Sequence, residues 1–223
     1  MNVRRWGLFL LLAVASGCSN LSGGKLGPEV SHRLVEVPRT DRNIQQEVFY
    51  ATSNNFTKRQ LYPFPAIYLQ TDAYYALKRV SDQLAVRGLQ LKIYDGYRPF
   101  RVQQKMWNLI RDERYVSNPA KNRGRHTRGT AVDVTLVGAD GKDLPMPSGF
   151  DDFTERAHPD YKGGTAEERE NRDLLRRVMV ANGFVPYPFE WWHFDLNNWE
   201  AYPVLDITFE EIEAGKKTTR KIE

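Results

Sequence analysis

Two of the four histidines in this sequence stand near carboxylates at spacings that could build a metal site. His126 precedes Asp133 by seven positions, and His193 follows Glu190 by three. Two imidazoles and one carboxylate form a ligand set suited to zinc, with a fourth position left for water, which is typical of catalytic sites. Glu190 would then be free to act as general base on that water. Spacing alone leaves a second interpretation open, in which these are solvated, capping or salt-bridge side chains.

The segment that follows His126 is predicted to run from a loop into a strand. The seven-residue spacing to Asp133 would also suit one face of a helix, but Gly129 and the β-branched residues after it disfavour a helix. Residues 130–136 alternate in polarity, so Val132 and its apolar neighbours fill one face and Asp133 points to the other. The neighbours of Asp133 on its face are small, which leaves open space above the sheet.

Glu190 and His193 present a geometric problem. Residues 191–194 are predicted to form a strand, and side chains three positions apart on an ideal strand face opposite sides of the sheet. A shared site therefore requires Glu190 to lie in the preceding loop or at a β-bulge, which Pro186 and Pro188 make possible. The aromatic residues of this segment are expected to form core and pocket wall.

The remaining pattern predicts an α+β domain. Periodicity indicates three helices and one further strand, over residues 72–87, 99–110, 165–182 and 89–94. Thr71 is expected to cap the first helix, Pro99 to begin the second, and Thr165 to open a capping box with Glu168 in the third. Helices and strands that intermix without a regular βαβ order favour a small, largely antiparallel sheet with flanking helices. The zinc site is expected in a cleft on that sheet.

The N-terminus has the pattern of an export signal. Residues 1–17 place two arginines before an apolar stretch too short to span a bilayer, which is typical of a signal peptide. Cys18 follows in a context that resembles the lipobox of bacterial lipoproteins, and ordinary cleavage after Ala15 is the alternative. Residues 18–40 are expected to hold the lipid-anchored cysteine and a tether, residues 41–205 the zinc domain, and residues 206–223 a solvated tail. The protein is therefore predicted to be exported, periplasmic or at the cell surface, and attached to the membrane through a lipid on Cys18.

Composition excludes several classes of protein. With 223 residues, 41% of them hydrophobic and 27% charged, the chain is neither disordered nor a membrane bundle, and its length suits one domain. The formal net charge of +4 includes two arginines of the predicted signal, so no nucleic-acid partner is predicted. A single cysteine excludes an intramolecular disulfide, so the core must stabilise the fold unaided.

Five sequence blocks stand in a fixed order along the chain. They read YATSNNFT from Tyr50, YDGYRP from Tyr94, HTRGTAVDVTL from His126, FDDFTER from Phe150 and EWWH from Glu190. Together they resemble the D-alanyl-D-alanine dipeptidases of the VanX type, over roughly residues 45–200. The resemblance implies that His126, Asp133 and His193 bind one zinc ion per chain and that Glu190 is the catalytic base.

The resemblance further implies that Arg98 stabilises the transition state and that Tyr50 and Asp151 hold the substrate ammonium. Arg98 is always cationic and suits an oxyanion, while a structural ion pair with Asp95 is the alternative. An ammonium facing Asp151 would explain selection of dipeptides, because a longer peptide has a neutral amide at that point. One departure is Gly124, where the family commonly has Ser, and this puts substrate affinity in question.

The activity implied is zinc-dependent hydrolysis of the small D-Ala-D-Ala dipeptide to two D-alanines, with no obligate protein partner. The export signal favours a role in cell-wall turnover. Two alternatives stay open. One is a D,D-carboxypeptidase or endopeptidase that trims longer peptidoglycan stem peptides with the same zinc ligands. The other is a non-catalytic, zinc-stabilised wall-binding module.

Overall fold

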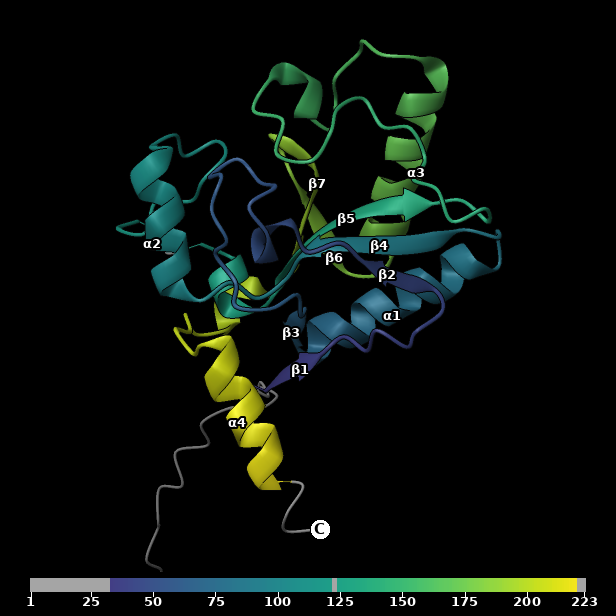
Figure 1. The fold of residues 1–223 in the computed structure, drawn as a ribbon. Helices are drawn as coiled ribbons and strands as arrows, with labels where there is room; N and C mark the ends of the chain where they lie inside the picture. The colour runs from purple at the N-terminus through teal and green to yellow at the C-terminus, as the bar shows by residue number, and fades with distance from the viewer. Residues whose placement is uncertain (1–32, 122–123, 220–223) are drawn as a thin grey trace, which may run out of the picture.

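The computed structural model describes residues 33–121 and 124–219, and Figure 1 shows their helices and strands in order along the chain. The predicted signal peptide, Cys18 and most of the predicted tether lie outside the described residues. Within the described part of the chain, no helix combines the length and the apolar character needed to cross a membrane.

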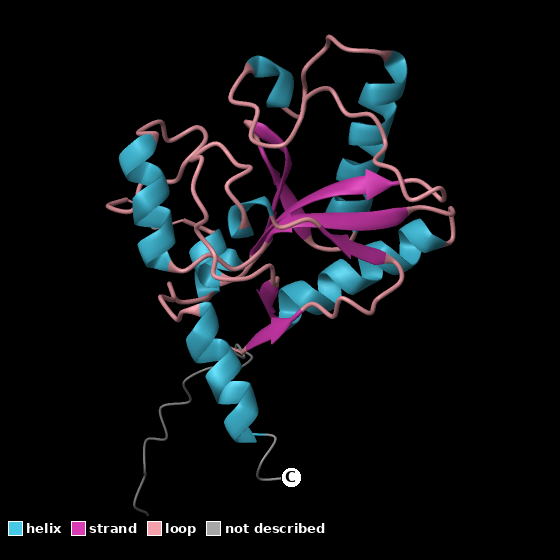
Figure 2. Cartoon of the chain, viewed as in Figure 1, coloured by secondary structure: helices cyan, strands magenta, loops and turns pink. Residues whose placement is uncertain are grey.

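A five-stranded sheet forms the centre of the molecule (Figure 2). Its strands lie side by side in the order β2 (Ile44–Gln46), β4 (Gln90–Asp95), β5 (Ala131–Val137), β7 (Glu190–Leu196) and β6 (Phe184–Tyr187). β2 and β4 run parallel, and the other neighbours run antiparallel. A second, antiparallel sheet pairs β1 (Leu34–Glu36) with β3 (Tyr68–Gln70).

Helices surround the sheets. The α-helices of the described residues are α1 (Thr71–Ala85), α2 (Phe100–Leu109), α3 (Ala166–Ala181) and α4 (Phe209–Thr219). Short 3-10 turns are η1 (Phe49–Ala51), η2 (His126–Arg128), η3 (Glu155–Ala157) and η4 (Trp199–Ala201). α1 and α3 pack against each other and against the strands, whereas α2 lies apart from both (Figure 1). The predicted α+β fold, with a largely antiparallel sheet and flanking helices, is confirmed.

The central strands of the large sheet are buried on both faces. All seven residues of β5 and all seven of β7 are buried. Val132, Val134 and Leu136 join the hydrophobic core, while Asp133 and Thr135 alternate with them. Burying a carboxylate is costly unless it is paired, so Asp133 is placed where a partner charge is needed.

The predicted elements agree with the structure to within a residue or two at their ends. The capping box of α3 is confirmed, because the Glu168 amide donates to Thr165 Oγ1 at 3.1 Å and the Thr165 amide donates to Glu168 Oε2 at 2.7 Å. Two other cap predictions are wrong. Thr71 lies inside α1, since β3 runs directly into that helix, and its hydroxyl donates to the carbonyl of Arg33. Pro99 precedes α2 as its N-cap and does not form its first turn.

The folded part of the chain extends beyond the predicted domain boundaries of 41–205. β1 lies in the segment expected to be a tether, where backbone pairing with β3 orders it. α4 lies in the segment expected to be a solvated tail. Its Phe209 packs against Tyr62 and Tyr68, with ring centroids 4.8 and 5.0 Å apart, and this contact docks the start of the helix. Both boundaries are therefore corrected outward.

Candidate active site

The sheet register places two of the predicted metal ligands opposite each other. Asp133 on β5 and His193 on β7 are direct partners in the antiparallel pairing. His126 reaches the same point from η2, the turn just before β5. Gly129 ends that turn with φ +71, and a Cβ there would lie 2.7 Å from a methyl group of Leu34, so glycine suits the position on both counts.

An irregularity in β7 brings Glu190 to the side that His193 occupies. In β6, Pro186 pairs with Phe194 of β7, whereas the next residue, Tyr187, pairs with Glu190. Residues 191–193 of β7 therefore lie between these two pairs. The Glu190 carboxylate consequently lies 3.7 Å from His193 Nδ1. Of the two placements expected for Glu190, a preceding loop or a bulge, the register shift at the start of β7 matches the bulge.

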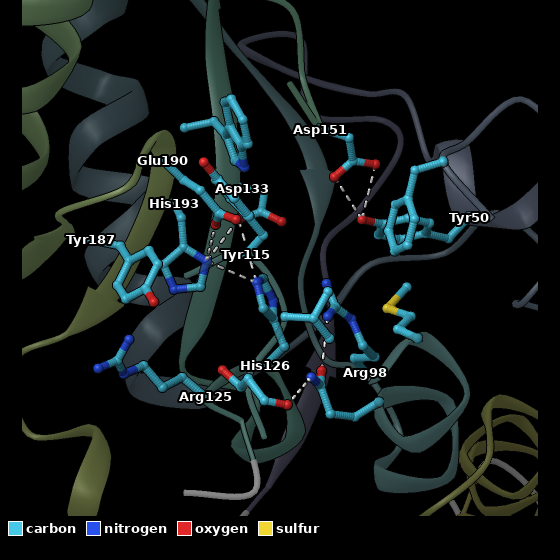
Figure 3. Close-up of a pocket in the computed structure, with 16 residues that line it drawn as sticks. Tyr50, Arg98, Tyr115, Arg125, His126, Asp133, Asp151, Tyr187, Glu190 and His193 are labelled. Atoms are coloured by element: carbon cyan, nitrogen blue, oxygen red, sulfur yellow. Dashed lines mark hydrogen bonds and ion pairs between the residues drawn. The ribbon is translucent and has the colours of Figure 1, made fainter. Parts of the chain in front are cut away.

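The three predicted ligands converge in a buried cluster. His126 Nε2 lies 3.1 Å from His193 Nδ1 and 3.4 Å from Asp133 Oδ1, and Asp133 Oδ1 lies 3.1 Å from His193 Nδ1 (Figure 3). Among the described residues, Asp133 Oδ1 has no hydrogen-bond partner of good geometry, although it is buried. A buried oxygen of this kind calls for a cation. The donor set, its closeness and this unsatisfied oxygen fit a zinc ion.

A second partner fixes each histidine ring. His126 Nδ1 lies 2.8 Å from the carbonyl oxygen of Gly96, which can only accept, so Nδ1 donates and Nε2 keeps the lone pair. His193 Nε2 donates to Asp195 Oδ1 at 3.0 Å, so its Nδ1 faces the other ligands. Outer hydrogen bonds of this kind orient metal-binding imidazoles. Sequence reasoning missed Asp195, although its position two residues after His193 on the same strand was an available signal.

The cluster carries surplus negative charge. Burial disfavours the charged form of His193, but the carboxylates of Asp195 and Asp133 outweigh burial and raise the pKa of this imidazole to about 10. Burial raises the pKa of the Glu190 carboxyl well above its usual value, an effect that His193 opposes and Asp133 increases. A bound divalent cation would balance this charge.

Arg98 forms the ion pair that the sequence left open, and it also lines the cavity. Its Nε and Nη2 donate to Asp95 Oδ2 at 3.1 and 2.7 Å, and its Nη1 donates to Gln103 Oε1 at 2.9 Å. The guanidinium lies over the ring of Tyr50, 5.3 Å from the centroid. Burial disfavours the cation, but the charge of Asp95 outweighs burial and raises the pKa of Arg98 well above its usual value. Arg98 is therefore a fixed cation in the cavity wall.

Tyr50 and Asp151 form a separate pair on the side of the cavity away from His193 (Figure 3). Tyr50 Oη donates to Oδ1 and Oδ2 of Asp151 at 3.0 and 3.1 Å. Burial and then the charge of Asp133 raise the pKa of Asp151 to about 8, and the hydrogen bond from Tyr50 opposes that rise. Asp151 has φ 57, a left-handed conformation that Asp tolerates better than most residues.

One narrow cavity of about 30 Å³ gathers all seven residues predicted for the site. They are Tyr50, Arg98, His126, Asp133, Asp151, Glu190 and His193. Trp192 lines the cavity as expected, whereas the lining residues Gln103, Arg125 and Tyr187 were not predicted. The guanidinium of Arg125 lies against the rings of Tyr187 and Trp199, 5.0 and 5.1 Å from their centroids. Its Nε lies 3.1 Å from Asp195 Oδ2, so it also supports the partner of His193.

Comparison with known proteins assigns this fold and site to a family. The model of peptidase family M15, described as D-Ala-D-Ala dipeptidase, matches residues 31–212. This chain belongs to that family. The D-alanyl-D-alanine dipeptidase of Escherichia coli (strain K12) is 36% identical over 176 residues, which are 79% of this chain and 91% of that protein. The D-alanyl-D-alanine dipeptidase of Enterococcus faecium is 32% identical over 180 residues, 72% of this chain and 89% of that protein. Among solved structures, VanYB in complex with D-alanine-D-alanine is 17% identical, with a TM-score of 0.39 over 60% of this chain and 74% of that chain.

The family match and the His–Asp–His cluster together identify the chain as a zinc metallopeptidase of family M15. This disfavours the alternative of a non-catalytic wall-binding module.

The departure at Gly124 has a structural basis in this M15 peptidase. Gly124 has φ +81, and a Cβ there would lie 3.3 Å from the Gln103 side chain, so the local backbone and packing both favour glycine.

Proposed function

We propose that this M15 peptidase hydrolyses the D-Ala-D-Ala dipeptide to two D-alanines, with one zinc ion per chain. The observation that carries the proposal is the placement of the metal cluster, Glu190 and the Tyr50–Asp151 pair around one narrow cavity. The relatives that match most of this chain are D-alanyl-D-alanine dipeptidases, which supports the same substrate.

His126, Asp133 and His193 would hold the metal. Zinc held there would lower the pKa of a water ligand toward about 7 and would polarise the carbonyl of the scissile bond. Gly96 and Asp195 keep the two imidazoles in the orientation that ligation requires.

We assign proton transfer to Glu190 and charge stabilisation to Arg98. Glu190 lines the cavity beside His193, where it can accept a proton from the attacking water and pass it to the leaving amine. Arg98 is held in place by Asp95 and Gln103 and stabilises the negative charge that develops on the carbonyl oxygen. The ion pair with Asp95 thus positions the catalytic cation instead of replacing its role.

Asp151 and Tyr50 are assigned to the free amino group of the substrate. A dipeptide places an ammonium beside the half-buried carboxylate of Asp151 and pairs its charge. A longer peptide places a neutral amide there and leaves the carboxylate without an opposite charge. This pair therefore favours the dipeptide over longer stem peptides and ranks a D,D-carboxypeptidase activity second.

A substrate panel tests this function. The purified protein is given D-Ala-D-Ala, L-Ala-L-Ala and a pentapeptide that ends in D-Ala-D-Ala, with and without zinc, and amine release is measured. Zinc-dependent cleavage of D-Ala-D-Ala alone is expected. Cleavage of the pentapeptide at the same rate would establish wall trimming instead, and no cleavage of any peptide by zinc-loaded protein would contradict the proposal.

We also propose that the enzyme is exported and held at the periplasmic side of a membrane or at the cell surface by a lipid on Cys18. The support is the arginine-then-apolar pattern of residues 1–17 followed by the single cysteine. In that compartment the enzyme would recover D-alanine from cell-wall turnover. In cell fractionation, the wild-type protein should be recovered with membranes and a Cys18→Ser variant should be released. Equal membrane recovery of both would contradict the anchor.

A further inference from the structure

A wider groove lies directly beyond the Tyr50–Asp151 pair. Its volume is about 490 Å³, against about 30 Å³ for the cavity that holds the metal cluster. Asp151 and Phe56 line both spaces, so these two side chains form the partition between them. Phe56 is packed edge-on against Tyr50 and Phe153, with ring centroids 6.1 and 5.2 Å apart. The aromatic half of the partition is therefore fixed in the fold.

The other half of the partition depends on one side chain in a costly conformation. Asp151 has φ 57, which non-glycine residues rarely adopt. In the described part of the chain, the hydroxyl of Tyr50 is the one hydrogen-bond donor to its carboxylate. This half of the partition therefore depends on the Asp151 side chain, which a single donor group holds in place.

The groove offers contacts that suit a peptide residue. Phe49, Tyr94 and Phe150 form an aromatic side, with ring centroids 4.7 to 5.7 Å apart. The exposed Asn54 lies on its lining, and a carboxamide can both donate to a peptide carbonyl and accept from a peptide N–H. An apolar side with a hydrogen-bonding rim is a suitable surface for one residue of an extended chain.

We propose that this groove is a latent subsite for the peptide residue that precedes a D-Ala-D-Ala pair, closed off from the metal cavity by the Asp151 carboxylate. The inference rests on the proposed function, because it takes Asp151 to mark the amino end of the dipeptide. A longer peptide extends through the nitrogen that Asp151 faces, so its next residue would have to enter the space on the far side of this carboxylate. The length limit of the enzyme then depends on the Asp151 side chain, the half of the partition that aromatic packing does not fix.

Asp151→Gly tests the inference directly. Glycine adopts φ 57 without steric cost, so the backbone is kept while the partition opens. Cleavage of the tripeptide L-Ala-D-Ala-D-Ala should rise at least about tenfold over wild type, and cleavage of D-Ala-D-Ala should fall at least about tenfold. The matched variant Asp151→Asn keeps the volume of the side chain and removes its charge. It should lose dipeptide activity without gaining tripeptide activity.

A second substitution distinguishes use of the groove from general loosening of the site. Asn54→Trp adds bulk inside the groove at an exposed position outside the catalytic machinery. Alone, it should leave cleavage of D-Ala-D-Ala unchanged. Combined with Asp151→Gly, it should return tripeptide cleavage to the wild-type level.

Circular dichroism and zinc content establish that each variant is folded and loaded, and Asp151→Ala serves as a second variant that opens the partition. A folded, zinc-loaded variant that cleaves the tripeptide no faster than wild type overturns the subsite. A tripeptide gain that persists with Asn54→Trp overturns it as well. Failure of the wild-type protein to cleave D-Ala-D-Ala would instead overturn the proposed function, so the two failures are distinguishable.

Discussion

The two ends of the cavity are built in different ways. At the metal end, Asp133 and His193 are paired across β5 and β7, and His126 enters from the turn before β5. At the amino end, Tyr50 stands on the short turn η1 and Asp151 stands in a segment with left-handed backbone. A one-residue slip in a buried sheet would turn every side chain of a strand to the other face, so the strand register fixes the positions of Asp133 and His193. Loops tolerate changes in sequence and conformation more readily. The contrast assigns the chemistry to the sheet and the selectivity to the loops.

The two ends also differ in how many partners hold each group. Each metal-binding histidine has a second hydrogen bond, to Gly96 for His126 and to Asp195 for His193. The Asp151 carboxylate is held by the single hydroxyl of Tyr50. Substitutions at the metal end should therefore reduce catalysis or metal affinity, and substitutions at the amino end should change which substrates are used.

The largest effect is expected from Glu190→Ala. A positioned general base contributes about 10²–10⁴-fold, so kcat for D-Ala-D-Ala should fall by about 10³-fold. Zinc content should stay at the wild-type level because Glu190 lies outside the ligand cluster. Steady-state kinetics and metal analysis check this, with Glu190→Gln as a control that keeps the side-chain volume. Wild-type turnover by zinc-loaded Glu190→Ala would remove Glu190 from the mechanism.

A smaller effect, on selectivity, is expected from Asp151→Asn. Removing one partner of a buried charge pair costs about 2–5 kcal/mol, so kcat/KM for the free dipeptide should fall by about 10²-fold. Because N-acetyl-D-Ala-D-Ala carries no ammonium, the variant should discriminate much less between the free and the acetylated dipeptide. The measurement is the ratio of the two kcat/KM values. A ratio equal to that of wild type would separate Asp151 from amine recognition.

Asp195→Ala should weaken metal binding without removing a ligand. Loss of an outer partner of a metal-binding histidine costs about 10–100-fold in affinity, measured here by competition with a zinc chelator. Asp82→Ala is the matched control, since it removes an exposed carboxylate on α1. Equal zinc affinity in the Asp195 variant and its control would show that His193 does not need this partner.

The smallest effect is expected far from both ends, at the start of α3. Thr165→Ala removes the hydroxyl of the capping box and should lower the free energy of unfolding by about 1 kcal/mol, with kcat and KM unchanged. Denaturant unfolding measures the change, and Thr165→Ser should restore most of the stability. A loss of activity in Thr165→Ala would mean that α3 influences the site, and it would contradict the separation of stability at α3 from catalysis in the cavity.

Much of the metal end could be predicted from the sequence because its signals are local. The alternation of polar and apolar residues around Asp133 predicts which face of β5 it occupies. The conflict between Glu190 and His193 required either a loop or a bulge at Glu190, and the register shift between β6 and β7 matches the second of these. The capping box at Thr165 is likewise a short-range pattern. These features depend on residues close together in the chain, which is where periodicity and capping rules apply.

The features that could not be predicted depend on contacts between distant segments. β1 forms because its backbone pairs with β3, and α4 docks because Phe209 meets aromatic rings far away in the chain. The groove beyond Asp151 has no signature in the sequence either, because segments from separate parts of the chain form it.

The central claim is that one cavity joins zinc chemistry to recognition of a free amino group. The most direct test compares kcat/KM of the zinc-loaded wild-type protein for D-Ala-D-Ala and for N-acetyl-D-Ala-D-Ala, which differ at the atom that Asp151 is assigned to face. A preference of at least about 10²-fold for the free dipeptide is expected, the size of the effect of one buried charge pair. Equal kcat/KM for the two peptides would contradict it.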